Sequence, residues 1–200
     1  MKGSPPAWNP DPEYLAAFAR LMRRLESGLE GYKGPPVPVY VAGGAAVHLY
    51  TGSRYSRDVD ARIGLEKVVL PADLKVSYKG PDGLPRILYF DTAYNESFAL
   101  LHEDVHADSI SISVPGVNAR RLDVKLFSPV DLAVSKLSRF EAHDQEDILA
   151  LSRAELIDAD SLRKRALEAL PGYVGPVRKL KTSLEIACRA IEKEAKAKKR

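Results

Sequence analysis

The chain has 200 residues, enough for one domain or for a domain with a helical appendage. Apolar residues make up 45% of it and charged residues 28%, which excludes a fibrous or a disordered protein. The net charge of +3 is too small to indicate a nucleic-acid partner by itself. The basic stretch EKEAKAKKR, residues 192–200, is either a solvated helix end or a source of attraction to a polyanion such as RNA.

Cys188 is the only cysteine, so no intramolecular disulfide can form and a reducing compartment, the cytoplasm, is expected. The first residues contain no apolar run of signal-peptide length, and no later segment approaches about 18 apolar residues in a row. We therefore expect a protein that does not enter a membrane.

The first part of the chain mixes helix and strand patterns. Apolar residues at three- and four-residue steps predict an amphipathic helix, and short β-branched runs bounded by glycine or proline predict strands. The expected elements are a helix from Pro12 to Gly31, a strand at 37–42, a helix ending at Gly52, and strands at 57–63, 75–78, 86–91, 109–114 and 121–127.

The rest of the chain has helical patterns. SPVD at residue 128 is an N-terminal capping signature, and a continuous helix is expected over residues 129–151. After the break at PGYVGP a final helix follows. These patterns predict an α+β protein, with a small mixed β-sheet core and flanking helices in residues 1–127 and a helical subdomain in residues 128–200.

Asp58 and Asp60 are two residues apart on an expected strand, so their side chains project from one face while Val59 faces the core. Two carboxylates so close repel each other unless a cation lies between them. Magnesium prefers oxygen ligands and keeps positions for water and substrate phosphates, so it meets that need. The alternative for this pair is a solvated strand face.

Gly43 and Gly44 lie where the preceding strand turns into a helix. Glycine permits close approach of a ligand to the backbone, and the free N–H groups at a helix start attract phosphate. A triphosphate on the glycine turn would thus have its metal ions at the aspartates. The alternative is a turn with no ligand.

This combination resembles a known signature. Two glycines after an apolar run, then thirteen residues, then Asp58 and Asp60 are similar to the nucleotidyltransferase superfamily that includes polymerase β, in its minimal bacterial form. The run from Arg54 through Ser56 to Asp60 is similar to the version in nucleotidyltransferase toxins of abortive-infection and toxin–antitoxin systems. The resemblance implies that Arg54 and Ser56, like the two glycines, bind the nucleotide.

A second motif, LFSPVDLAVSKLSRFEAHDQEDILAL at residues 126–151, resembles the downstream motif of that branch. Its positions are Lys136, Arg139, Asp144 and Asp147, and His143 stands where relatives more often have lysine or arginine. The resemblance implies that Lys136 and Asp144 are catalytic and that Arg139 binds phosphate. On one continuous helix these groups would be partly buried, and an internal salt-bridge ladder is the alternative.

Superfamily members commonly use a third carboxylate from a neighbouring strand. Asp91, at the end of RILYFD, is the first candidate for this metal ligand, and Asp123 in RLDVKLF is the second. For each, a plain strand-end or turn residue is the alternative.

The resemblance implies a magnesium-dependent nucleotidyltransferase with two metal ions at Asp58, Asp60 and Asp91. It would transfer a nucleoside monophosphate from a nucleoside triphosphate to an acceptor hydroxyl, with RNA, and tRNA first, as the implied acceptor and a cognate antitoxin as an implied partner. Transfer to a small molecule or a protein, and a non-catalytic nucleotide- or RNA-binding module, are the alternatives. The intact aspartate pair argues against the module.

Overall fold

The structure is a computed structural model that describes residues 9–65, 70–97 and 99–198. The chain divides into two units. One, here called the sheet unit, holds the described residues up to Tyr94 together with Ser109–Phe127. The other, here called the helical unit, holds the described residues of Asn95–Asp108 and those from Ser128 onward. The chain therefore leaves the sheet unit after Tyr94 and returns to it at Ser109.

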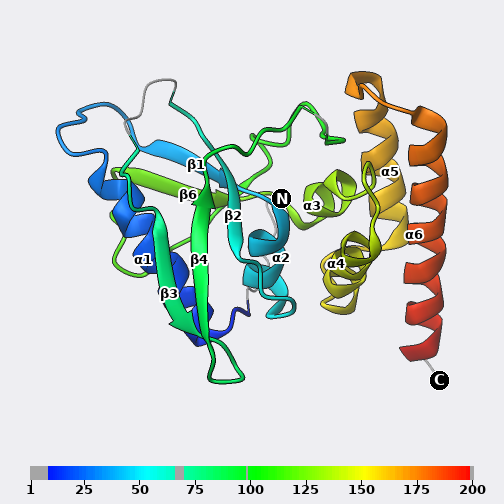
Figure 1. The fold of residues 1–200 in the computed structure, drawn as a ribbon. Coiled ribbons are helices and arrows are strands. Elements are labelled where there is room, and N and C mark those ends of the chain that lie inside the picture. The colour runs from blue at the N-terminus through cyan, green and yellow to red at the C-terminus, as the bar shows by residue number, and fades with distance from the viewer. Residues whose placement is uncertain (1–8, 66–69, 98, 199–200) are drawn as a thin grey trace. The chain divides into compact units, whose positions relative to one another are not determined.

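The sheet unit contains a mixed sheet in the order β3-β4-β2-β1-β6-β5, of which Figure 1 labels all strands but β5. β2 is parallel to β4, β1 is parallel to β6, and the other neighbours are antiparallel. The strands are β1 (Val37–Val41), β2 (Asp58–Ile63), β3 (Lys75–Lys79), β4 (Pro85–Asp91), β5 (Ile110–Ser111) and β6 (Leu122–Leu126).

Helix α1 (Pro12–Ser27) covers one face of β3 and β4. It begins at Asp11, whose side chain accepts a hydrogen bond from the Tyr14 N–H (3.0 Å). Phe18, Leu21, Met22 and Leu25 are fully buried, and each contributes about 1.5–3 kcal/mol on burial. The opposite face of β4 is exposed, since Ile87 and Tyr89 keep 56% and 42% of their surface.

The helical unit contains α3 (Pro129–Ser135), α4 (Ala142–Arg153), α5 (Ala159–Ala169), a 3₁₀ turn at Leu170–Gly172, and α6 (Val177–Lys198). α6 packs along α4 and α5, and α3 packs against both of those helices. The expected cap of α3 is present, because the Asp131 N–H donates to Ser128 Oγ (3.2 Å). Within the described residues, no helix has the length and apolar character needed to cross a membrane.

The α+β prediction is confirmed, but two expected elements differ. The strand expected at 109–114 is reduced to Ile110–Ser111. The continuous helix expected over 129–151 is wrong, because Phe140 has φ 56°, a left-handed conformation that a right-handed helix cannot contain. A second helix starts just after it, with Asp144 Oδ2 accepting from the Glu141 N–H (3.0 Å).

Candidate functional site

Three carboxylates of the sheet unit share one face of two neighbouring strands. β2 and β4 pair with Asp58 beside Tyr89 and with Asp60 beside Asp91. Paired residues on adjacent strands lie about 4.8 Å apart and point to the same face. Val59 is buried on the opposite face, and all three aspartates are half-buried. The strand register therefore gathers Asp58, Asp60 and Asp91 into one acidic face.

The glycine turn touches this acidic face. Helix α2 (Gly43–Thr51) begins directly after β1, and its N-cap, Ala42, provides no side-chain hydrogen bond. Gly43 has φ 62°, and a Cβ there would collide with the Asp60 carboxylate, with Cγ at 2.8 Å. Only glycine fits this position, so the backbone at the start of α2 lies close to the Asp60 carboxylate.

The segment before β2 lines the same turn. A Cβ added at Gly44 would collide with the Arg54 guanidinium and would lie 3.1 Å from Ser56 Oγ. Ser56 is buried, and its hydroxyl donates to Asp58 Oδ1 (2.6 Å). The structure thus places Arg54 and Ser56 at the glycine turn, and the hydrogen bond from Ser56 holds the Asp58 carboxylate in place.

The two candidates for a third carboxylate lie at different ends of the sheet. Asp123 pairs with Pro38, at the start of β1. Asp60 lies beyond the other end of β1, because its carbonyl accepts a hydrogen bond from the N–H of Ala42 (2.8 Å). Four strand residues span about 13 Å, so Asp123 is remote from Asp60. Of the two, Asp91 is the one that the structure brings beside Asp60.

The side chains of the acidic face are held by local bonds. Asp91 Oδ1 accepts from the Ala93 N–H (2.8 Å), just as Asp58 accepts from Ser56. Among residues 9–65, 70–97 and 99–198, no group of three or more His, Cys, Asp or Glu side chains lies so arranged that it could hold a metal ion. Metal binding at this face would therefore draw on one or two carboxylates together with oxygens of a bound substrate.

The residues of the downstream motif form a charged cluster within the helical unit. Lys136 Nζ lies 2.9 Å from Asp147 Oδ2 and 3.6 Å from Asp144 Oδ1. Arg139 donates two hydrogen bonds of 2.8 Å to Asp144. Lys136 is only 7% exposed and both aspartates are buried, whereas half of the Arg139 side chain is exposed. The cluster has the form of the internal salt-bridge ladder.

The protonation of Asp144 follows from these contacts. Burial raises its pKa, but the hydrogen bonds from Arg139 and from the Glu141 N–H, together with the charge of Lys136, outweigh burial and leave the pKa below the ordinary aspartate value. Asp144 is therefore ionised at neutral pH, and it caps α4 while pairing with two cations.

Sequence reasoning did not find an aromatic group in the sheet unit. The Tyr14 ring lies 4.1 Å from that of His48 and 5.7 Å from that of Tyr78. His48 Nδ1 lies 2.8 Å from the Ser53 carbonyl and carries the proton, while Nε2 accepts from the Asp11 N–H (3.2 Å). Burial lowers the pKa of His48, so this ring is a neutral packing group.

A hollow of about 720 Å³ opens beside the acidic face and is lined in part by Tyr55, Arg57 and Tyr89. The sequence RILYFD contained a signal for apolar side chains beside the acidic face, because strand alternation puts Ile87 and Tyr89 on the same face as Asp91.

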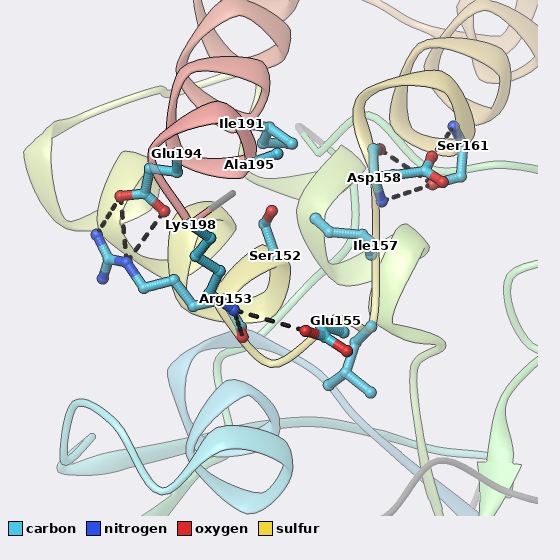
Figure 2. A pocket seen from close by; sticks show the side chains of 11 residues that line it. Ser152, Arg153, Glu155, Ile157, Asp158, Ser161, Ile191, Glu194, Ala195 and Lys198 are labelled. Atoms are coloured by element: carbon cyan, nitrogen blue, oxygen red, sulfur yellow. Dashed lines mark hydrogen bonds and ion pairs between the residues drawn. The ribbon is translucent and has the colours of Figure 1, made fainter. Parts of the chain in front are cut away.

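A second hollow, of about 640 Å³, lies in the helical unit. Its charged groups pair with one another, as Figure 2 shows for Arg153 with Glu194 (2.7 Å) and Lys198 with Glu155 (3.7 Å). The second hollow has no excess of cations that would favour a phosphate ligand.

Comparison with known proteins identifies a family for this chain. Neither the curated proteins nor the solved structures contain a chain that matches this one. A family model described as "Nucleotidyltransferase of unknown function (DUF6036)" matches residues 16–196, which include the glycine turn, the acidic face and the charged cluster of the helical unit. The chain therefore belongs to this nucleotidyltransferase family.

Proposed function

We propose that the protein is a magnesium-dependent nucleotidyltransferase that moves a nucleoside monophosphate from a nucleoside triphosphate to an acceptor hydroxyl of RNA, with tRNA as the first candidate. One observation carries this proposal: the glycine turn at the start of α2 contacts Asp60, on the face that Asp58 and Asp91 share. A phosphate-binding helix start and a set of carboxylates thus meet at one place.

The residues of this face fit magnesium. Magnesium in phosphate-transfer sites is held through one or two carboxylates and the substrate phosphates, and Asp58 and Asp60 offer two carboxylates side by side. Ser56 fixes the orientation of Asp58 by its 2.6 Å hydrogen bond. When bound, magnesium would supply positive charge that offsets the charge of the phosphates and of the leaving pyrophosphate.

The chain itself supplies the remaining functions. Backbone N–H groups of Gly43 and Gly44 would bind the phosphates of the triphosphate, because the start of α2 has no side-chain cap to occupy them. The Arg54 guanidinium beside Gly44 would offset the charge that builds up on the phosphate oxygens. Asp91, paired with Asp60, would orient the acceptor hydroxyl toward the α-phosphorus.

The finer assignments rest on the resemblance to toxins. The spacing from Arg54 to Asp60 and the downstream positions Lys136, Arg139 and Asp144 support a toxin-type enzyme with a cognate antitoxin. Arg139, with half of its side chain exposed, has surface available for a phosphate. Lys136 and Asp144 are buried and paired, so we assign them first to holding the helical unit together.

A labelled-nucleotide assay tests the proposal. Purified protein would be incubated with each α-labelled triphosphate, magnesium and total tRNA or protein extract, beside Asp58→Asn. Asp123→Asn is the matched control, because Asp123 lies at the remote end of the same sheet. We expect label on tRNA with the wild type and with Asp123→Asn, and none with Asp58→Asn.

Each other outcome points elsewhere. Label on a protein would move the acceptor to a side chain, and label on a small molecule would exclude nucleic acid. Equal labelling by wild type and Asp58→Asn would refute a role for the acidic face. No labelling of any acceptor, with nucleotide binding insensitive to Asp58→Asn, would leave the non-catalytic binding module as the better description.

A further inference from the structure

The exposed face of β4 carries apolar side chains at positions where a solvated strand would have polar ones. Ile87 and Tyr89 stand exposed there, on a strand whose buried face already packs against α1, and Leu84, in the turn before β4, is exposed as well. Exposed apolar side chains that lie together mark binding surfaces more often than exposed apolar side chains that are scattered singly.

Two hollows border this face of β4. The first, of about 720 Å³, is lined by Tyr55, Tyr78 and Tyr89 with Arg57 and Arg86. The other is a smaller hollow of the sheet unit, of about 400 Å³. It is lined by Arg20, Arg24 and Lys75, and Ile87 lines both hollows. We call the two hollows together the β4 groove.

The β4 groove begins at the acidic face. Tyr89 pairs with Asp58 on one side and with Lys75 on the other, so the three form a row across β2, β4 and β3. Neighbours in such a row are about 4.8 Å apart. The glycine turn follows β1, on the opposite side of β2 from β4. The turn and the groove therefore flank Asp58 and Asp60 from opposite sides.

The charge and chemistry of the β4 groove suit one class of ligand. Its lining contains five cationic side chains and two acidic ones, Asp73 and Asp82. The Arg86 guanidinium lies over the Tyr55 ring at 5.1 Å, which adds a cation–aromatic pair to the lining of the first hollow. Aromatic rings interspersed with cations are the means by which proteins bind single-stranded nucleic acid.

We propose that the β4 groove binds a single-stranded segment of the acceptor RNA, with one base stacked on Tyr89 and phosphates near Arg57 and Lys75. This inference rests on the proposed function, and it names the surface that holds the acceptor. The nucleoside triphosphate on the glycine turn and the acceptor strand in the β4 groove then approach Asp58 and Asp60 from the two sides.

Binding of a short RNA tests this without catalysis. A fluorescein-labelled single-stranded RNA of about eight nucleotides would be titrated with protein by anisotropy, with neither triphosphate nor magnesium present. Loss of one stacking ring weakens binding by about 5- to 150-fold, so we expect Tyr89→Ala to raise Kd at least about fivefold. Tyr89→Phe keeps the ring and should bind as the wild type does.

Tyr32→Ala is the matched control, because Tyr32 is a partly exposed tyrosine of the sheet unit outside both hollows. Thermal melting would verify that each variant is folded. Equal Kd values for Tyr89→Ala and wild type would overturn the proposal. The proposal would also be overturned if a free mononucleotide competed more tightly than RNA. A third contrary result would be loss of RNA binding only when Lys193 and Lys196 of α6 are changed to glutamine.

The two proposals fail separately. Asp58→Asn should bind the RNA at least as tightly as the wild type while losing transfer. RNA binding that depends on Tyr89, without transfer of any nucleotide, would refute the proposed function and leave the β4 groove as an RNA site. Transfer to tRNA that is unaffected in rate and KM by Tyr89→Ala would refute the groove and leave the enzyme.

Discussion

Substitution of Lys136 by methionine separates a structural role of the charged cluster from a catalytic one. Lys136 Nζ lies 2.9 Å from one buried carboxylate and 3.6 Å from another. At an effective dielectric constant of about 20 these contacts amount to about 6 and 5 kcal/mol of attraction, much of which offsets the desolvation of the three charges. Lys136→Met would remove the attraction and leave both carboxylates buried.

The net loss expected for such a change is about 3–5 kcal/mol. The entropy of unfolding of a chain of 200 residues is about 0.4 kcal/mol per kelvin, so Tm should fall by about 7–12 °C. Differential scanning calorimetry of both proteins in the same buffer measures this. Arg153→Gln is the control, because the side chain of Arg153 is 44% exposed and its pair with Glu194 should contribute about 1 kcal/mol or less.

A Tm for Lys136→Met within about 2 °C of the wild type would refute this reasoning. If nucleotide transfer were lost in that same folded variant, Lys136 would be a group that acts on the phosphates, as the resemblance to toxins implies. A large fall in Tm accompanied by normal transfer below the new Tm would assign the cluster to the fold alone.

Two further predictions concern the aromatic group of the sheet unit. The Tyr14 hydroxyl is fully buried with no hydrogen-bond partner among the described residues, so Tyr14→Phe should raise the free energy of unfolding by about 1–3 kcal/mol, measured by urea denaturation; a loss of stability would contradict this. Burial lowers the pKa of His48 below 6.5, so the unfolded chain binds a proton at His48 at a pH where the folded chain does not. The free energy of unfolding should therefore fall as the pH drops below about 6.5. Tm measured from pH 7.5 to 5 should show this slope in the wild type and less of it in His48→Gln; parallel curves would exclude His48 as its origin.

The parts of the fold set by short-range patterns could be predicted from the sequence. The strand that carries Asp58 and Asp60 follows from period-two alternation, and the turn before α2 follows from Gly43 and Gly44. Each of these features depends on a few neighbouring residues, so no knowledge of the tertiary structure was needed.

Features that depend on distant pairing could not be predicted in the same way. Asp91 and Asp123 both end or lie within strand patterns, and only the sheet order decides which of them meets Asp60. The split of the expected helix at Phe140 was hidden for a different reason. Apolar spacing continues through both α3 and α4 because each buries one face, and the start of α4 is set by the hydrogen bond that the N–H of its N-cap, Glu141, donates to Asp144.

The return of the chain to the sheet at Ser109 has a consequence for biosynthesis. β1 and β6 are neighbours although Val37 and its partner Leu122 are far apart in the sequence, so the sheet closes only after about 120 residues have left the ribosome. The segment that precedes Ser109 packs later still, because the Asp108 carboxylate pairs with Arg165 (2.7 Å) only after α5 has been synthesised. A chain truncated after Phe127 and released from the ribosome would contain every strand of the sheet, with both aspartates of β2, but would lack the helices against which the segment before Ser109 packs.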